Sequence, residues 1–90
     1  MKFEWDEKKA IANLGKHGVS FEEARTLFDD SFHVEFYDPD HSQDEHRYII
    51  VGQSERHRLL VVSFTELDDT IRLISARELT GTEREAYEEG

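Results

Sequence analysis

Arginine supplies every permanent positive charge from residue 47 onward, in or beside apolar segments of the chain. A guanidinium group presents parallel N–H donors that match two oxygens of a phosphate, so arginines rooted in strands are candidate phosphate-binding groups. Ordinary ion pairs with the 21 aspartates and glutamates are the alternative for each of them. The arginines concerned are Arg47, Arg56, Arg58, Arg72, Arg77 and Arg84.

Two other residues could transfer protons beside such a phosphate. His17 directly precedes Gly18 at the expected end of a helix, where the helix dipole favours a protonated imidazole and therefore a proton donor. The structural alternative is that His17 only binds the last helical carbonyl groups. Glu66 lies close to strand cations that could orient it as a general base, although a salt bridge at a strand end would use the same residue.

On the first expected helix, Lys9, Asn13 and Lys16 recur at positions i, i+4 and i+7. This spacing places two cations and an amide on one helix face, which could contact a polyanion. A solvated helix surface is the alternative for the same three residues.

The polar stretch after the first expected strand carries oxygen-bearing residues at alternate positions, from Asp38 to Asp44. A calcium loop begins with this spacing, but it needs glycine at the sixth position and glutamate at the twelfth, where this chain has Gln43 and Ile49. Histidines 41 and 46 lie in the same exposed stretch. We therefore expect no metal site here.

The chain of 90 residues is long enough for one domain with one core, and 37% of its residues are hydrophobic. It has no cysteine, which excludes disulfides, thiolate metal sites and a cysteine nucleophile. No basic-then-apolar leader opens the chain, and no apolar run approaches the roughly 18 residues that span a bilayer. We expect a cytoplasmic protein without membrane contact.

The net charge of −10 argues against non-specific binding to nucleic acid. The acidic residues concentrate in residues 21–46 and 78–90, so a locally positive face can persist elsewhere. The acidic surface could also dock a basic protein, which gives a second hypothesis of a non-catalytic binding module. A direct nucleic-acid-binding regulator is least favoured, because no basic helix or helix-turn-helix pattern occurs.

In the N-terminal third, the order of apolar and polar residues predicts a short strand at residues 3–5, and the capping residues predict two helices after it. Asp6 is a suitable N-cap for the first, which should end near Gly18 and bury a stripe of Ala10, Ile11 and Leu14. Ser20 and Glu23 form a capping box for a second helix that extends to about Phe28.

From residue 32 the apolar period changes from 3.6 to 2, which predicts a half-buried strand at 32–37. Three more strands are predicted at residues 47–52, 58–66 and 70–77, followed by a short helix capped by Thr80 or Thr82. The order of elements predicts one α+β domain over residues 1–90, with N-terminal helices packed on a mainly antiparallel sheet of four to five strands.

The expected turns also predict a register. A two-residue loop at Asp68-Asp69 pairs Thr65 with Arg72 and Ser63 with Ile74, and a loop at 54–57 pairs Tyr48 with Ser63. Under this register the polar, open face of the sheet excludes Arg77 and Glu66 unless a bulge or twist redirects them. That face would carry Tyr48, Ser63, Thr65 and Arg72.

Several blocks of residues, spread along nearly the whole chain, form a specific pattern. The opening block has Trp5-Asp6, Lys9 and Asn13 before the run Lys16-His17-Gly18-Val19-Ser20-Phe21-Glu22-Glu23-Ala24. The later blocks are Phe28-Asp29-Asp30, Asp38-Pro39-Asp40-His41, Arg47, Gly52-x-Ser54, Arg58 to Val62, Thr65-Glu66 and Ile71 to Arg77. In this order the blocks resemble those of the BrnT toxins of bacterial type II toxin–antitoxin systems.

This resemblance implies a RelE-like fold and a metal-independent ribonuclease that arrests translation without a cofactor. It also implies a BrnA-type ribbon–helix–helix antitoxin, whose dimer, and not the toxin alone, binds operator DNA. The chain departs from RelE-like nucleases in being acidic where they tend to be basic. On this basis the predicted catalytic residues are Arg72, Arg77, His17, Glu66 and Lys16, and the predicted RNA-binding residues are Lys9, Asn13, Arg58 and Tyr48.

Overall fold

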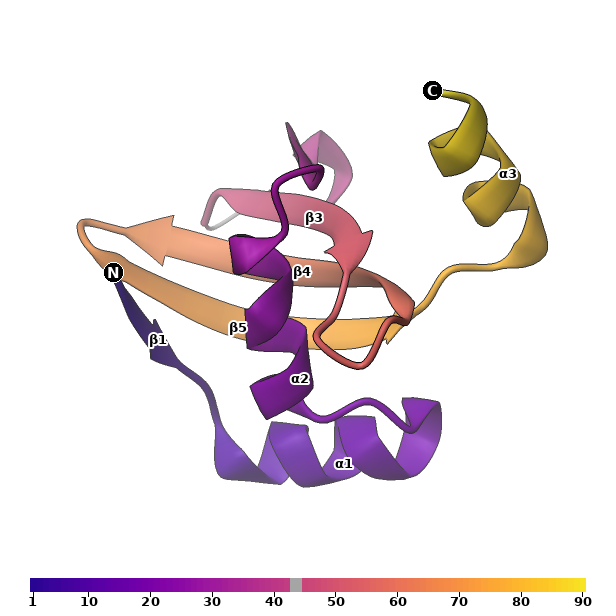
Figure 1. Ribbon diagram of the computed structural model, residues 1–90. Coiled ribbons are helices and arrows are strands. Elements are labelled where there is room, and N and C mark those ends of the chain that lie inside the picture. Colours follow the sequence, from indigo (N-terminus) through magenta and orange to yellow (C-terminus); the bar gives the residue numbers. More distant parts are fainter. Residues whose placement is uncertain (43–44) are drawn as a thin grey trace.

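The structure is a computed structural model that describes residues 1–42 and 45–90 (Figure 1). Gln43 and Asp44, which belong to the calcium-like spacing, lie outside the described residues. The elements are β1 (Lys2–Glu4), α1 (Glu7–His17), α2 (Phe21–Arg25), the 3-10 helix η1 (Thr26–Asp29), β2 (Val34–Tyr37), the 3-10 helix η2 (Pro39–His41), β3 (Arg47–Gln53), β4 (Leu59–Leu67), β5 (Thr70–Glu78) and α3 (Gly81–Glu89).

The described residues form a five-stranded sheet in the order β1-β5-β4-β3-β2. Strands β2 to β5 make antiparallel pairs, whereas β1 joins β5 in parallel, with Phe3 opposite Ile71. The predicted α+β class with a mainly antiparallel sheet is therefore confirmed. Among these residues no helix is both long and apolar enough to cross a membrane.

The helix termini follow the predicted caps. The Asp6 carboxylate accepts hydrogen bonds from the backbone N–H groups of Lys8 and Lys9, at 2.8 and 3.3 Å. At the other end of α1, Gly18 adopts a left-handed conformation with φ of 69° and donates its N–H to Leu14 O. The Ser20 hydroxyl likewise accepts the N–H of Glu23 at 3.0 Å, so the capping signals located both starts correctly. The reciprocal half of the predicted capping box is wrong, because the Glu23 carboxylate binds Arg58 and Ser54 instead of the Ser20 N–H.

The predicted apolar stripe on α1 is wrong. Ile11 and Leu14 have 71% and 52% of their surface exposed, and Ala10 is only partly buried. The reason is the position of the helix, which runs alongside the outer edge of β5 instead of covering a face of the sheet (Figure 1).

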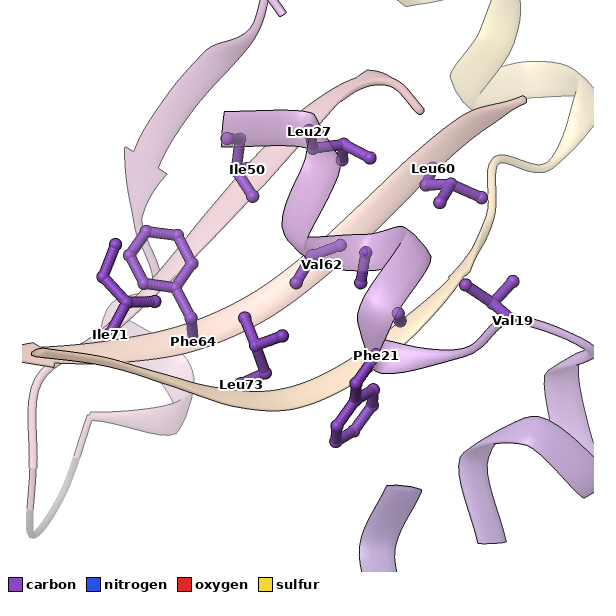
Figure 2. Packing of buried hydrophobic residues seen from close by; sticks show 11 residues of the cluster. Val19, Phe21, Leu27, Ile50, Leu60, Val62, Phe64, Ile71 and Leu73 are labelled. Atoms are coloured by element: carbon purple, nitrogen blue, oxygen red, sulfur yellow. The ribbon is translucent and has the colours of Figure 1, made fainter. Parts of the chain in front are cut away.

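The hydrophobic core lies between one face of the sheet and the segment formed by α2 and η1 (Figure 2). Phe21 and Leu27 from that segment are fully buried, as are the strand residues that face them. Burying side chains of this size stabilises the fold by about 1.5–3 kcal/mol each. The strand contribution comes from Ile50, Leu60, Val62, Phe64, Ile71 and Leu73.

The hairpin from β4 to β5 has the predicted register, with Thr65 opposite Arg72 across Asp68-Asp69. The hairpin from β3 to β4 does not. Tyr48 pairs with Phe64 instead of Ser63, because the loop consists of residues 54–58 and is one residue longer than predicted. A hydrogen bond from Ser54 N–H to Arg58 O, at 2.8 Å, closes this loop. One additional loop residue turns every side chain of the strand to the opposite face. Tyr48 therefore faces the core.

A β-bulge corrects the prediction for the C-terminal half of β5. Phe64 pairs with Leu73 but Ser63 pairs with Ser75, so Ile74 is an additional residue and the predicted Ser63 to Ile74 pair is wrong. A bulge of one residue changes the face on which the following side chains lie. Arg77, opposite Val61, consequently shares the uncovered face of the sheet with Thr65 and Arg72.

The first predicted antiparallel strand is less buried than expected. All four residues of β2 are exposed, because β2 is an outer strand that pairs only with β3. Val34 and Phe36 each retain 49% exposure. We call the side of the sheet opposite α2 and η1 the open face; besides Val34 and Phe36 it carries Arg47, Ile49, Val51, Val61, Ser63, Thr65, Arg72, Ser75 and Arg77.

Candidate active site

A cavity of about 410 Å³ lies on the open face, over strands β3 to β5. Its floor is apolar and its walls carry cations and histidines from three parts of the chain. The predicted residues His17 and Arg77 meet here. The full lining is His17, Asp38, His41, Arg47, Ile49, Val61, Ser63, Ile74, Ser75, Ala76 and Arg77.

His17 reaches the cavity because Asn13 fixes α1 against β5. Strand β1 pairs only with residues 70–72, which leaves the outer edge of β5 without a neighbouring strand further along. There the Asn13 amide donates to Ala76 O at 2.8 Å and to Val19 O at 2.9 Å, and accepts Ala76 N–H at 3.1 Å. The Asn13 amide thus pairs with β5 in place of a neighbouring strand. Because Asn13 is only 7% exposed, it is not available to RNA, contrary to the predicted binding role.

Arg58 is likewise enclosed by protein groups. Its guanidinium binds both carboxylate oxygens of Glu23 and donates to Gly18 O at 3.0 Å, while Ser54 donates to the same carboxylate at 2.7 Å. The hydrogen bond from Arg58 lowers the pKa of Glu23, which is 3% exposed, and the same bond raises the pKa of Arg58. These contacts join α1, α2 and the loop before β4, so they give Arg58 a structural role, and its RNA-binding role stays a prediction.

Arg77 remains on the cavity wall, but α3 holds one side of it. Its terminal nitrogens donate to the two oxygens of Glu83 at 2.7 and 3.0 Å. Both side chains are about two-fifths exposed, at 41% and 42%. The bond from Arg77, assisted by Thr80, lowers the pKa of Glu83 to about 2, and it raises the pKa of Arg77. Glu83 occupies the position that a phosphate would need for a bidentate contact.

The β2–β3 connection contributes residues that the sequence analysis did not place in the site. His41 Nδ1 lies 2.8 Å from Asp38 Oδ2, and their side chains are 67% and 14% exposed. Arg47 lies at the start of β3, and within residues 1–42 and 45–90 its buried Nε has no hydrogen-bond partner. Asp38, His41 and Arg47 all belong to the blocks that resemble the family, and this was the signal that could have identified them. In the sequence, Asp38 and His41 were interpreted only as part of a possible metal loop, and Arg47 only as one of several arginines.

Other predicted residues lie away from this cavity. Arg72 and Glu66 line a second hollow of about 510 Å³ together with Glu4 and Thr65, and Arg72 Nη1 donates to Glu4 at 2.8 Å. In the described part of the chain, Lys9 and Lys16 are exposed and line neither hollow. The predicted catalytic residues are thus divided: His17 and Arg77 line the first cavity, Arg72 and Glu66 line the second hollow, and Lys16 lines neither in the part that the structure describes. Glu66 lies opposite Ile71, so the register keeps it off the open face, as predicted.

Tyr48 cannot contact RNA on that face. Its ring stacks on Phe64 at a centroid distance of 5.7 Å and an angle of 27°, on the core side of the sheet. The predicted RNA-binding role for Tyr48 is wrong because it depended on the register that the β3–β4 loop overturns.

A family model described as "Ribonuclease toxin, BrnT, of type II toxin-antitoxin system" matches residues 5–83. The chain belongs to the BrnT family. Type II toxins act with a protein antitoxin, so a cognate antitoxin is implied for this BrnT chain as well. The resemblance found in the sequence is confirmed by this match.

The fold is similar to the crystal structure of the Brucella abortus ribonuclease toxin BrnT. The TM-score is 0.65 at 23% sequence identity, and the match covers 89% of this chain and 97% of the Brucella chain. A search of the curated proteins gives no match. At this identity the structural likeness establishes the fold of the new BrnT member, and the roles of its residues have to be argued from its own geometry.

The cavity of this BrnT chain combines groups suited to phosphate chemistry. Arg47 and Arg77 can neutralise an anion, and the imidazoles of His17 and His41 can donate or accept a proton. Ile49 contributes an apolar surface that a nucleobase can contact. Among the described residues, no group of three or more His, Asp and Glu side chains could hold a metal ion.

Proposed function

We propose that residues 1–90 act as one domain, a ribonuclease that cleaves RNA by attack of the 2′-hydroxyl on the neighbouring phosphate and thereby inhibits translation. The observation that carries this proposal is the open-face cavity that brings Arg77 and His17 together in a BrnT chain. The reaction as proposed is metal-independent and needs no cofactor, because side chains supply both the charge and the proton transfers.

In this mechanism Arg77 binds the scissile phosphate and exchanges its Glu83 carboxylate for phosphate oxygens of similar geometry. His17, beside the C-terminus of α1, donates a proton to the leaving 5′-oxygen. Its position follows from the Asn13 contacts with β5, so a group on a helix end is held to a strand of the sheet.

We assign Arg72 and Glu66 to the flanking RNA, since both line the second hollow. Arg72 shares its face with Arg77, and a bound strand that follows the sheet surface would meet both. Lys9 and Lys16 are exposed on α1, where they can attract the RNA backbone without touching the reacting phosphate. The direct catalytic roles are therefore reserved for residues of the first cavity.

We further propose that a BrnA-type ribbon–helix–helix antitoxin neutralises this toxin in the cytoplasm and supplies all contacts to operator DNA. A DNA-binding dimer carries basic surface, which complements a toxin of net charge −10. The docking of a basic protein, which the charge pattern suggested as a separate function, becomes part of the toxin function in this proposal.

Cleavage of a mixed-sequence RNA oligonucleotide by the purified protein in EDTA tests the function. Arg77→Ala should reduce the cleavage rate by about 10²–10³-fold, the usual cost of removing a group that stabilises transition-state charge. Arg56→Ala is the matched control, because Arg56 is exposed and its substitution should leave the rate unchanged. If the wild-type protein neither cleaves RNA in EDTA nor arrests growth when expressed, the proposed function is wrong.

A further inference from the structure

We propose that His41, oriented by Asp38, is the general base that removes the proton of the attacking 2′-hydroxyl. The inference rests on the proposed ribonuclease function and deepens it by dividing the proton transfers between two histidines. Asp38 acts as a positioning residue, and Arg47 provides a second cation for the phosphate.

The hydrogen bond of His41 determines its chemical role. Nδ1 faces the Asp38 carboxylate at 2.8 Å, and a carboxylate can only accept, so the proton of a neutral imidazole resides on Nδ1. Nε2 then carries the free lone pair that a base requires. The carboxylate also stabilises the imidazolium that forms when Nε2 takes a proton. With 67% exposure, the His41 side chain is open to a substrate, whereas that of Asp38 is largely enclosed at 14%.

The segment that carries this pair is anchored at both ends. Asp38 N–H donates to Arg47 O at 2.9 Å, which extends the pairing of β2 with β3 by one residue. Arg47 N–H in turn donates to the Ser42 hydroxyl at 2.9 Å. His41 is therefore held over the start of β3, next to the cavity floor, by contacts that do not involve its own ring.

The sheet order places the two histidines on opposite sides of the cavity. His17 belongs to α1, which lies along β5, whereas His41 follows β2, and strands β4 and β3 separate those two strands. In-line displacement requires the attacking and leaving oxygens to lie on opposite sides of phosphorus. A base from the β2 side and an acid from the β5 side satisfy this requirement.

Arg47 offers the second contact to the phosphate. Its Nε is buried and lacks a partner among the described residues, and its terminal nitrogen lies 3.6 Å from Glu45. The contact with Glu45 is long and the Arg47 side chain is 32% exposed, so the terminal nitrogens of Arg47 can still bind a phosphate oxygen. A phosphate between Arg47 and Arg77 would be neutralised from both sides.

The proposed step balances without a co-reactant. The 2′-hydroxyl proton moves to His41 Nε2 while the O2′–P bond forms, the P–O5′ bond breaks, and His17 gives its proton to O5′. The products are a 2′,3′-cyclic phosphate and a 5′-hydroxyl. The rate should therefore depend on pH as a bell, with neutral His41 and protonated His17 required; the charged groups that line the cavity around them are Asp38, Arg47 and Arg77.

The test measures cleavage of an RNA oligonucleotide by the full-length protein across pH. His41→Ala should lower the rate by about 10²–10⁴-fold, the usual contribution of general acid–base catalysis, and added imidazole should restore part of it. Asp38→Asn should also lower the rate, because Nδ1 loses the carboxylate that orients the ring, and Asp38→Glu should restore part of it. His57→Asn is the control, since this exposed loop residue with φ of 64° tolerates asparagine and lines neither hollow in the described chain.

A substrate with sulfur in place of the 5′-bridging oxygen separates the two histidines, because a thiolate leaves without protonation. The expected result is full rescue of His17→Ala and no rescue of His41→Ala, with thermal melts showing that both variants fold. If the sulfur substrate rescues His41→Ala, or if His41→Ala cleaves RNA as fast as wild type, His41 is not the base although the ribonuclease function stands. Absence of cleavage by the wild-type protein would instead refute the function itself.

Discussion

The helix-covered side of the sheet and its open face differ in how completely their charged side chains are paired and buried. On the covered side, Glu23 and Arg58 satisfy each other and are closed off by Ser54 and the end of α1. On the open face, Arg77 is held from one side by a carboxylate that is itself 42% exposed, and Arg47 has a long contact of 3.6 Å with Glu45, which is 52% exposed. Sealed groups serve the fold, whereas incompletely paired groups remain available to a ligand.

Removal of Glu23 should reduce stability most, because Glu23 and Arg58 are paired on the covered side of the sheet. Glu23→Ala leaves Arg58 without its principal partner and should lower the free energy of unfolding by about 3–5 kcal/mol, as for other buried pairs that lose one member. Urea unfolding monitored by Trp5 fluorescence measures it.

Glu22→Ala is the control for this experiment, because Glu22 is exposed on the same helix and should change stability by less than about 0.5 kcal/mol. Equal stabilities of the two variants would show that the covered side is not sealed in the way described, and the contrast between the two faces would fail.

A smaller effect is expected at the edge of β5. Asn13→Ala leaves Ala76 N–H and Ala76 O without their partner and should destabilise the protein by about 1–3 kcal/mol, the cost of unsatisfied buried groups. Lys9→Ala, one turn earlier and exposed, should leave the midpoint of urea unfolding unchanged. If the two substitutions instead weaken RNA binding equally and spare stability, Asn13 contacts RNA as its helical spacing first indicated.

The sequence predicted the elements because their signals are local. Caps such as Asp6 and Ser20 act within three residues, and the Asp68-Asp69 turn fixes its own hairpin. These features depend on backbone groups that are always close together in the chain. The helix starts and the register of β4 with β5 next to the turn were therefore correct.

The site was harder to predict because its geometry depends on the exact lengths of a loop and a strand and on contacts between residues far apart in the sequence. One extra residue in the β3–β4 loop turned Tyr48 inward, and one bulged residue, Ile74, turned Arg77 outward. Asn13 and Ala76 are 63 positions apart, and no periodicity links them. Residue type suggested Arg77 and His17, which line one cavity, but it could not distinguish an arginine bound to the buried Glu23 from one that lines a cavity.

Substitution of Glu83, at the boundary of the open face, should change stability least, because Glu83 is partly exposed and competes with phosphate for Arg77. Glu83→Gln preserves the shape of the side chain and removes its charge. Because both partners are about two-fifths exposed, the loss in stability at neutral pH should be under about 1 kcal/mol after solvent screening. The cleavage rate should rise a few-fold, since the guanidinium of Arg77 no longer has to leave a carboxylate before it binds phosphate.

The pH dependence distinguishes this effect from a general change in packing. The Arg77 hydrogen bond lowers the pKa of Glu83 to about 2 from an ordinary value of 4.5, so its stabilisation is fully present above pH 4.5 and is lost as the pH falls toward 2. The difference in unfolding free energy between wild type and Glu83→Gln should therefore shrink across that interval. A difference that stays constant with pH would assign the effect to packing, and a slower rate in the variant would mean that Glu83 positions Arg77 for catalysis instead of competing with the substrate.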